Sequence, residues 1–229
     1  MKSLQSWGKA ARTSIPVMAG YLVLGAGFGI LLRTRGYGLG WALAMSGFIY
    51  AGSMQYVAVD LLTGGASLLT AAVTTLLVNA RHLFYGISML ERYRAAGKYA
   101  PYLIFSLTDE TYSLLAARED LTGADCFRIS LLDQLYWVLG TAIGSLAGAY
   151  LRFDTTGIDF SLTALFLTVF TEQWLDTKDH TPALIGLGVS IVCRLVFGED
   201  GFLLPTMGGM LCCLLVLDAR RTGRGGESA

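Results

Sequence analysis

The sequence is short of charge, and this shortage argues against most soluble classes of protein. Only 15% of the 229 residues are charged, whereas 54% are hydrophobic and the mean hydropathy is +0.55. A typical soluble domain has about 25% charged residues. Basic and acidic residues number 17 each, so the net charge does not indicate a nucleic-acid partner. The composition predicts a protein that lies in the lipid bilayer.

The motifs of common enzyme and metal sites are also missing. The sequence has no GxSxG, P-loop, HExxH or dinucleotide-binding fingerprint. Its four cysteines form no CxxC pair, and its two histidines do not stand at metal-ligand spacing from them. We therefore expect no enzymatic activity, no cofactor and no metal site, and we interpret the cysteines as apolar filling.

Long apolar segments make up most of the chain. A helix that spans the bilayer needs about 20 mostly apolar residues. Candidate segments lie near residues 14–32, 40–62, 66–90, 100–117, 129–151, 159–175, 181–197 and 202–218. The sequence thus predicts an all-α, polytopic integral membrane protein with seven or eight segments. We expect a single membrane domain over residues 1–229, with cytoplasmic tails at 1–13 and 219–229.

The number of crossings stays open between seven and eight. The distribution of Lys and Arg favours eight crossings with both tails in the cytoplasm. In the alternative, the stretch 48–56 bends back without crossing.

Parts of the first half of the chain recur in the second half. YLVLGAGFG at 21–29 matches YWVLGTAIG at 136–144. YAGSMQY at 50–56 then matches VFTEQW at 169–174 and aligns Gln55 with Gln173, and RHLFYG at 81–86 matches RLVFG at 194–198 and aligns Arg81 with Arg194. The order predicts two related halves, near 14–117 and 129–218, running parallel or inverted. Repeated halves are common in secondary transporters, which bind substrate near the bilayer midplane.

Glycines recur at four-residue spacing in the two matched segments. Gly25 and Gly29 share one helical face, as do Gly140, Gly144 and Gly148. In lipid, small residues on one face allow two helix backbones to approach closely. We expect these glycines to serve helix packing rather than substrate contact.

The stretch LLVNARHLFYG at 76–86 places Asn79, Arg81 and His82 within an apolar run. An ionisable side chain at the membrane centre costs a few kcal/mol, so it needs a partner or a wet cavity. In one interpretation the helix ends nearby, and the side chains reach the membrane surface. In the other, Asn79 and Arg81 face an internal cavity, which the matching Arg194 favours.

Carboxylates that could partner an arginine occur in FSLTDETYSLL at 105–115. Asp109 and Glu110 are adjacent, so on a helix they point about 100° apart. We expect one of them to pair with an arginine and the other to titrate. Asp60 and Asp133 are expected at the membrane interface, with a role inside the membrane as the alternative.

The stretch GFIYAGSMQY at 47–56 combines glycines and polar residues within an apolar segment. If the helix unwinds at Ala51, Gly52 and Ser53, free N–H groups are available to an anion such as a carboxylate. The alternative is an intact helix in which Ser53 bonds to its own backbone.

The stretches GFGILLRTRGYGLGWALAMSGFIYAGSMQYVAVDLL, LLVNARHLFYGISML and FSLTDETYSLL together resemble the AzlC family of branched-chain amino acid permeases. The likeness extends over most of the chain and is densest from Gly27 to Tyr112. It implies the large subunit of a two-component exporter in the cell membrane, with a small membrane partner of the AzlD type. The implied substrates are leucine, isoleucine, valine and sometimes methionine, and the implied driving force is the proton motive force.

A zwitterionic amino acid needs a cationic or N–H-rich group for its carboxylate and an acceptor for its ammonium. We expect the carboxylate at Arg81 and the 51–53 break (Gly52, Ser53), with Arg194 as a second candidate. Gln55, Asn79 and Gln173 are expected to hydrogen-bond the substrate. Proton coupling is assigned to Asp109, Glu110, His82 and Glu172. Two other functions remain as alternatives, a passive channel for small solutes and a membrane subunit that stabilises a partner without transporting.

Overall fold

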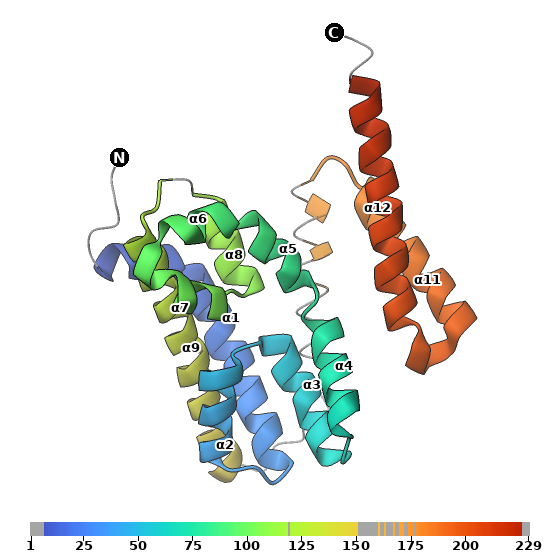
Figure 1. The fold of residues 1–229 in the computed structure, drawn as a ribbon. Coiled ribbons are helices and arrows are strands. Elements are labelled where there is room, and N and C mark those ends of the chain that lie inside the picture. Colours follow the sequence, from blue (N-terminus) through green and yellow to red (C-terminus); the bar gives the residue numbers. More distant parts are fainter. Residues whose placement is uncertain are drawn as a thin grey trace. The chain divides into compact units, whose positions relative to one another are not determined.

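The computed structural model describes residues 7–118, 120–150 and 177–225, together with 160, 163, 167, 170, 171, 174 and 175. Regular secondary structure in these residues is helical throughout, which confirms the all-α class for them (Figure 1). The chain divides into two compact units, residues 1–163 and 164–229. This boundary differs from that of the expected repeat halves, which falls between 117 and 129.

The first unit contains α1 (Trp7–Thr34), α2 (Leu39–Ala44), the π-helical turn η1 (Met45–Ile49), α3 (Gly52–Thr63), α4 (Leu68–Val78), α5 (Arg81–Ser88), α6 (Leu90–Ala95), the 3-10 turn η2 (Gly97–Tyr99), α7 (Ala100–Phe105), α8 (Asp109–Ala116) and α9 (Gly123–Tyr150). The second contains α11 (Thr181–Gly201) and α12 (Leu203–Gly225).

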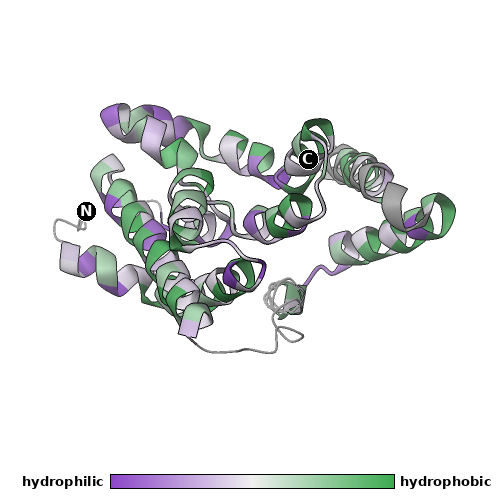
Figure 2. Cartoon of the chain, turned by 90° about the horizontal axis from the view of Figure 1, so that it is seen from below, coloured by the Kyte–Doolittle hydropathy of each residue, from purple (hydrophilic) through white to green (hydrophobic). Residues whose placement is uncertain are grey.

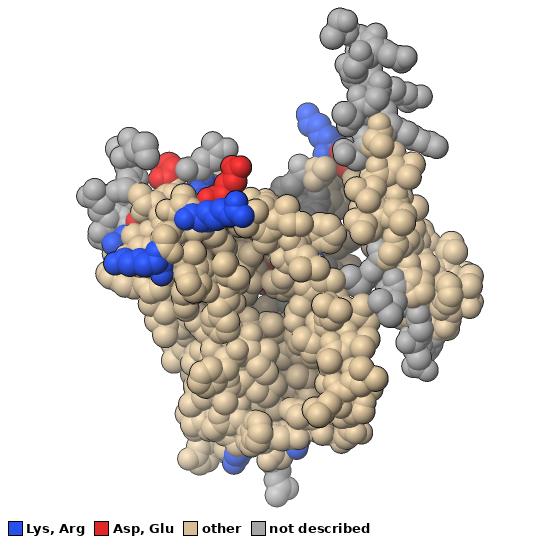
Figure 3. Space-filling model, viewed as in Figure 1, with Lys and Arg blue, Asp and Glu red and all other residues tan. Residues whose placement is uncertain are grey.

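Large apolar side chains point outward from the helices, as the bilayer prediction requires. Val23 and Leu68 are 73% and 90% exposed, and Figure 2 shows hydrophobic residues spread along the helices. On the face of the first unit shown in Figure 3, charged side chains gather toward opposite ends, with a broad uncharged belt between them. Among the described residues, three helices are long and apolar enough to cross a membrane, Trp7–Thr34, Gly123–Tyr150 and Thr181–Gly198.

Helices α1 and α9 pack against each other in parallel at very short range. A Cβ at Gly140 would meet the Tyr21 and Leu22 backbone, one at Gly144 would meet the Ala26 backbone, and one at Gly148 would meet Ile30 and Arg33. The contacts thus advance along both helices in the same direction. The expectation that the repeated glycines serve helix packing is confirmed for this pair.

The segment expected near 40–62 is a hairpin of two short helices. Its first arm is α2 with η1, and its second arm is α3. Arg35 lies just before the first arm and forms an ion pair of 3.9 Å with Asp60, near the end of the second arm. The hairpin therefore begins and ends on the same side of the first unit (Figure 1). The alternative that 48–56 bends back therefore matches the structure.

The segment expected near 100–117 is a second hairpin, made of α7 and α8, which enters from the opposite end of α1. Phe127, near the start of α9, lies beside Tyr99, just before the entering arm, and Tyr102 within that arm, both with ring centroids 5.1 Å away. After the returning arm, the Arg118 guanidinium donates to Thr13 Oγ1 at 3.4 Å, near the start of α1. This segment also turns back, so the count of seven or eight crossings is not confirmed.

The tips of the two hairpins meet at Tyr21, in the middle of α1. The Tyr21 ring lies 6.5 Å from the Tyr50 ring in the first tip, and its hydroxyl lies 2.6 Å from Thr108 Oγ1 in the second. Helices α4 and α5 run beside both hairpins and join at Asn79 and Ala80. Three breaks in helical structure therefore lie near one depth of the first unit.

In the second unit, α11 and α12 form a helical pair. A Cβ at Gly209 would lie 2.9 Å from Val189 Cγ1, so these helices are also in close contact. Gly198 breaks the helical path of α11 with φ +74°, a conformation that favours glycine. Because much of 151–176 lies outside the described residues, the internal repeat stays a prediction.

Candidate functional site

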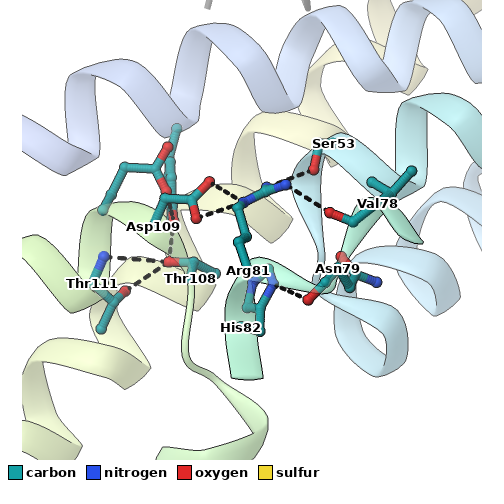
Figure 4. Close-up of polar contacts among 10 residues, drawn as sticks. Ser53, Val78, Asn79, Arg81, His82, Thr108, Asp109 and Thr111 are labelled. Atoms are coloured by element: carbon teal, nitrogen blue, oxygen red, sulfur yellow. Dashed lines mark hydrogen bonds and ion pairs between the residues drawn. The ribbon is translucent and has the colours of Figure 1, made fainter. Parts of the chain in front are cut away.

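Arg81 connects the tips of the two hairpins. Its Nε donates to both carboxylate oxygens of Asp109 at 2.8 and 3.1 Å, and its Nη2 donates to Ser53 Oγ at 2.8 Å (Figure 4). Its Nη1 donates to the Val78 carbonyl oxygen at 2.8 Å. The side chains of Arg81 and Asp109 are 29% and 31% exposed. The arginine is thus held within the unit by α3 and α8, which favours the interpretation that it faces the interior.

Local sequence explains why Ser53 and Asp109 stand at helix starts. Tyr50 has the left-handed backbone conformation (φ 43°, ψ 48°), which stops the first arm, and Gly52 then begins α3. Thr108 caps α8 by accepting a hydrogen bond from the Thr111 N–H at 3.3 Å. Because helix N-termini carry partial positive charge, both starts favour an anion nearby. A helix break is present, but it lies at Tyr50 and Ala51 rather than over 51–53, because Gly52 and Ser53 are the first residues of α3.

Glu110 and Asp109 use different partners, as expected for adjacent residues of one helix. Asp109 faces Arg81, whereas Glu110 Oε2 accepts a hydrogen bond from the Tyr21 hydroxyl at 2.8 Å. The prediction that one of the two acids pairs with an arginine is confirmed for Asp109. The expected role of Glu110 in proton coupling stays a prediction.

Gln55 lies away from the Arg81 cluster and is completely buried. Its Nε2 donates to Ser46 Oγ at 3.2 Å, and its Oε1 accepts from Trp137 Nε1 at 2.9 Å. Both ends of the amide are therefore bonded within the protein and join α3 to η1 and α9. A role for Gln55 in binding substrate stays a prediction.

Replacing Gln55 with leucine is expected to lower the free energy of unfolding by about 1–3 kcal/mol, because Trp137 Nε1 is left buried without an acceptor. The measurement is thermal unfolding in detergent. The double variant Gln55→Leu/Trp137→Phe removes donor and acceptor together and should lose less than the sum of the two single changes. Strict additivity would contradict this account of the bond.

Asn79 and His82 face a different region from Arg81. Both line an apolar cavity of about 570 Å³, together with residues of α4, α5, α6 and α7 such as Leu76, Leu83 and Ile104. His82 Nδ1 lies 3.1 Å from the Asn79 carbonyl oxygen (Figure 4). Asn79 Oδ1 is buried and has no partner in the described part of the chain. The structure therefore separates these two residues from Arg81.

Of the site residues expected from the second half, the structure describes only Arg194. Glu172 and Gln173 lie outside the described residues. Arg194 is exposed on α11, with its guanidinium carbon 5.6 Å from the centre of the Phe202 ring. Their roles stay predictions.

Sequence reasoning missed several buried polar residues next to the cluster. Asp133 was expected at the membrane interface, but its side chain is completely buried in α9, so that expectation is wrong. Thr111 Oγ1 donates to Asp133 Oδ2 at 2.9 Å. Asp60, in contrast, is 75% exposed, as an interfacial position requires. The adjacent polar pair Asp133 and Gln134 in an apolar segment was the signal available in the sequence.

Comparison with known proteins now adds to this geometry. The family pattern described as AzlC protein matches residues 16–151, which is more than half of the chain. The chain belongs to the AzlC family. The matched range runs from α1 to the end of α9 and includes Ser53, Arg81, Asp109 and Asp133. The expected resemblance is confirmed.

Relatives within the AzlC family cover most of the chain. The protein is 44% identical over 208 residues to the branched-chain amino acid transport protein AzlC of Bacillus subtilis. The aligned residues cover 89% of this chain and 82% of that relative. It is 42% identical over 217 residues to an uncharacterized membrane protein of Helicobacter pylori, and the aligned residues cover 93% of this chain and 95% of that relative. The inner membrane protein YgaZ of Escherichia coli is 28% identical over 225 residues, covering 91% and 89%. No solved structure matches the chain.

Proposed function

We propose that this AzlC-family protein is a secondary transporter of branched-chain amino acids in the cell membrane. One relative, 44% identical, carries the name of a branched-chain amino acid transport protein. The observation that supports transport most directly is the Arg81–Asp109 ion pair at the meeting point of two helical hairpins. Broken helices at mid-depth are where secondary transporters bind their substrates.

The ion pair suits a zwitterion because it offers one charge for each end of an amino acid. A substrate carboxylate would replace Asp109 at the Arg81 guanidinium and face the start of α3 near Ser53. The ammonium would then bind the released Asp109 carboxylate. Neither charged side chain is left unpaired during the exchange, which avoids the cost of an isolated charge in a poorly hydrated region.

The finer parts of the proposal follow from the family resemblance. We propose that the protein exports leucine, isoleucine, valine and, to a lesser degree, methionine from the cytoplasm. The proton motive force would drive export, and a small AzlD-type membrane subunit would complete the transporter. Glu110, beside Asp109 and bonded to Tyr21, is the carboxyl that supports proton coupling.

Counterflow in proteoliposomes tests the proposal. Vesicles with the protein, with and without the AzlD-type subunit, are loaded with unlabelled leucine and given labelled leucine outside. A carrier produces transient, saturable accumulation of the label, which isoleucine and valine suppress and lysine does not. A channel allows equilibration without accumulation, and a non-transporting subunit allows neither. Each of these latter results would refute the proposed transporter.

A further inference from the structure

Beside the Arg81 cluster, an unbroken chain of three hydroxyls links two carboxyls. Glu110 Oε2 lies 2.8 Å from the Tyr21 hydroxyl, which lies 2.6 Å from Thr108 Oγ1. Thr108 Oγ1 lies 3.0 Å from Thr111 Oγ1, which lies 2.9 Å from Asp133 Oδ2. The chain runs from the tip of the second hairpin through α1 to the interior of α9.

The linking groups are closed to bulk water. Thr111 and Asp133 have no exposed surface, Tyr21 is 3% exposed and Thr108 is 7% exposed. The second carboxyl oxygen of Asp133, Oδ1, is buried and has no partner in the part of the chain that the structure describes. Protons that move between the two carboxyls therefore have the hydroxyls as their route.

Counting protons shows that the hydroxyls alone cannot form this chain. Four oxygen–oxygen contacts each require one shared proton, but the three hydroxyls supply one proton each. If Tyr21 donates to Glu110 and Thr108 donates to Thr111, no proton lies in the 2.6 Å contact between Tyr21 and Thr108. One carboxyl must supply the fourth proton.

We propose that Glu110 and Asp133 share one proton through the hydroxyls of Tyr21, Thr108 and Thr111, and that this proton is the one coupled to substrate movement. The coupling part rests on the proposed transport function, whereas the shared proton does not. Two arrangements satisfy all four contacts. Either Asp133 is the acid and every hydroxyl donates toward Glu110, or Glu110 is the acid and every hydroxyl donates toward Asp133.

Passage between the two arrangements moves one proton and leaves the total charge unchanged. Asp133 Oδ2 gives its proton to Thr111, and Thr111 passes its own to Thr108. Thr108 passes its proton to Tyr21, and Tyr21 gives its proton to Glu110 Oε2. At each hydroxyl oxygen one O–H bond breaks and one forms, while Asp133 Oδ2 loses an O–H bond and Glu110 Oε2 gains one, so no further donor or acceptor is needed.

The surroundings favour Asp133 as the acid when no substrate is bound. Glu110 lies in the first turn of α8, where the helix dipole favours a negative charge, and the nearby Arg81 also favours the carboxylate form, whereas the neighbouring Asp109 opposes it. Asp133 interacts with the tyrosines Tyr50 and Tyr102, and no Lys, Arg or His among the described residues forms an ion pair with it. A substrate ammonium or carboxylate at Arg81 and Asp109 would change the field at Glu110 and so shift the proton.

Infrared spectroscopy of the purified protein tests the shared proton without any transport measurement. With ¹³C-carboxyl-labelled aspartate, the wild type is expected to show a label-sensitive C=O band of a protonated carboxylic acid near neutral pH. Asp133→Asn should remove that band, and Thr111→Val should shift it, because the hydrogen bond to Oδ2 is lost. Tyr136→Phe on the same helix should leave it unchanged. The same measurement with ¹³C-carboxyl-labelled glutamate detects the arrangement in which Glu110 is the acid. Absence of both bands, or persistence of the aspartate band in Asp133→Asn, would overturn the shared proton.

Proteoliposomes then test the coupling. Thr111→Val and Tyr21→Phe should lower proton-driven leucine movement by at least about 100-fold, the size of effect expected for a positioned proton-transfer group. Leucine–leucine counterflow should stay at the wild-type rate, because exchange moves no net proton. Proton-driven movement at the wild-type rate in both variants would refute the coupling role. If the wild type carries no leucine at all, the proposed function fails, while the infrared result still decides the shared proton.

Discussion

Replacing Arg81 with glutamine is expected to lower leucine counterflow by at least about 100-fold, equivalent to about 2.8 kcal/mol. Arg81 bonds to Asp109 and Ser53 from the start of α5, so its loss removes the carboxylate site and separates the two hairpin tips. Hydrogen bonds to charged groups contribute about 1.5–3 kcal/mol each, so the loss of two accounts for this size. The measurement is initial counterflow rate against leucine concentration in proteoliposomes.

Two further variants make the Arg81 result specific. Arg35→Gln removes an arginine from an exposed ion pair with Asp60. Because exposed ion pairs contribute little, this change should leave leucine counterflow close to the wild-type rate. Arg81→Gln/Asp109→Asn removes both charges, so no uncompensated carboxylate remains, and it should insert and unfold like the wild type yet still fail to exchange leucine. Wild-type affinity in either Arg81 variant would show that the ion pair does not bind substrate.

Replacing Gly144 with alanine is expected to destabilise the first unit by about 3 kcal/mol, the upper end of the usual range for overpacking. A Cβ at this position would lie 2.0 Å from the Ala26 carbonyl oxygen and 2.6 Å from Ala26 Cα. Both are backbone atoms of α1, so the clash is relieved only if the two helices move apart. For a chain of this size, the midpoint of thermal unfolding in detergent should fall by roughly 6–12 °C.

Gly20→Ala is the matched control on the partner helix. Its Cβ would have no heavy atom within 4 Å, so the change adds no contact between helices. Alanine is about 1 kcal/mol more favourable than glycine in a helix interior, so stability should be unchanged or slightly raised. Equal midpoints for the Gly144 and Gly20 variants would show that α1 and α9 are not packed this closely.

The sequence predicted an ion pair between an arginine and either Asp109 or Glu110, because a charged side chain within lipid needs a counter-charge. An arginine within an apolar segment needs a counter-charge, and Asp109 and Glu110 were the adjacent carboxylates within another apolar segment. Hydropathy could not reveal the hairpins, because it reports the length and apolar character of a segment but not whether the segment crosses the bilayer or turns back within it. The segments at 40–62 and 100–117 are long enough to cross, yet each turns back.

The proton chain could not be predicted, because its members are ordinary residues when taken singly. Tyr21, Thr108 and Thr111 each have common structural roles in helices, and nothing in their spacing joins them. Thr108 and Thr111 lie on one turn of α8, but Tyr21 and Asp133 come from helices that are remote in sequence. Only distances between side chains show that five oxygens stand in one line of hydrogen bonds.

The sequence by itself determined the bilayer setting, the helical class, the AzlC family and the close packing of glycine faces, because each depends on composition or local spacing. Tertiary structure decided which polar residues meet. It joined Ser53, Arg81 and Asp109 at two hairpin tips, placed Gln55 and Asp133 in the interior, and turned Asn79 and His82 toward another cavity. The physical reason is that a buried polar group is stabilised by whichever partner the fold brings within hydrogen-bonding distance, and that distance is unrelated to separation along the chain.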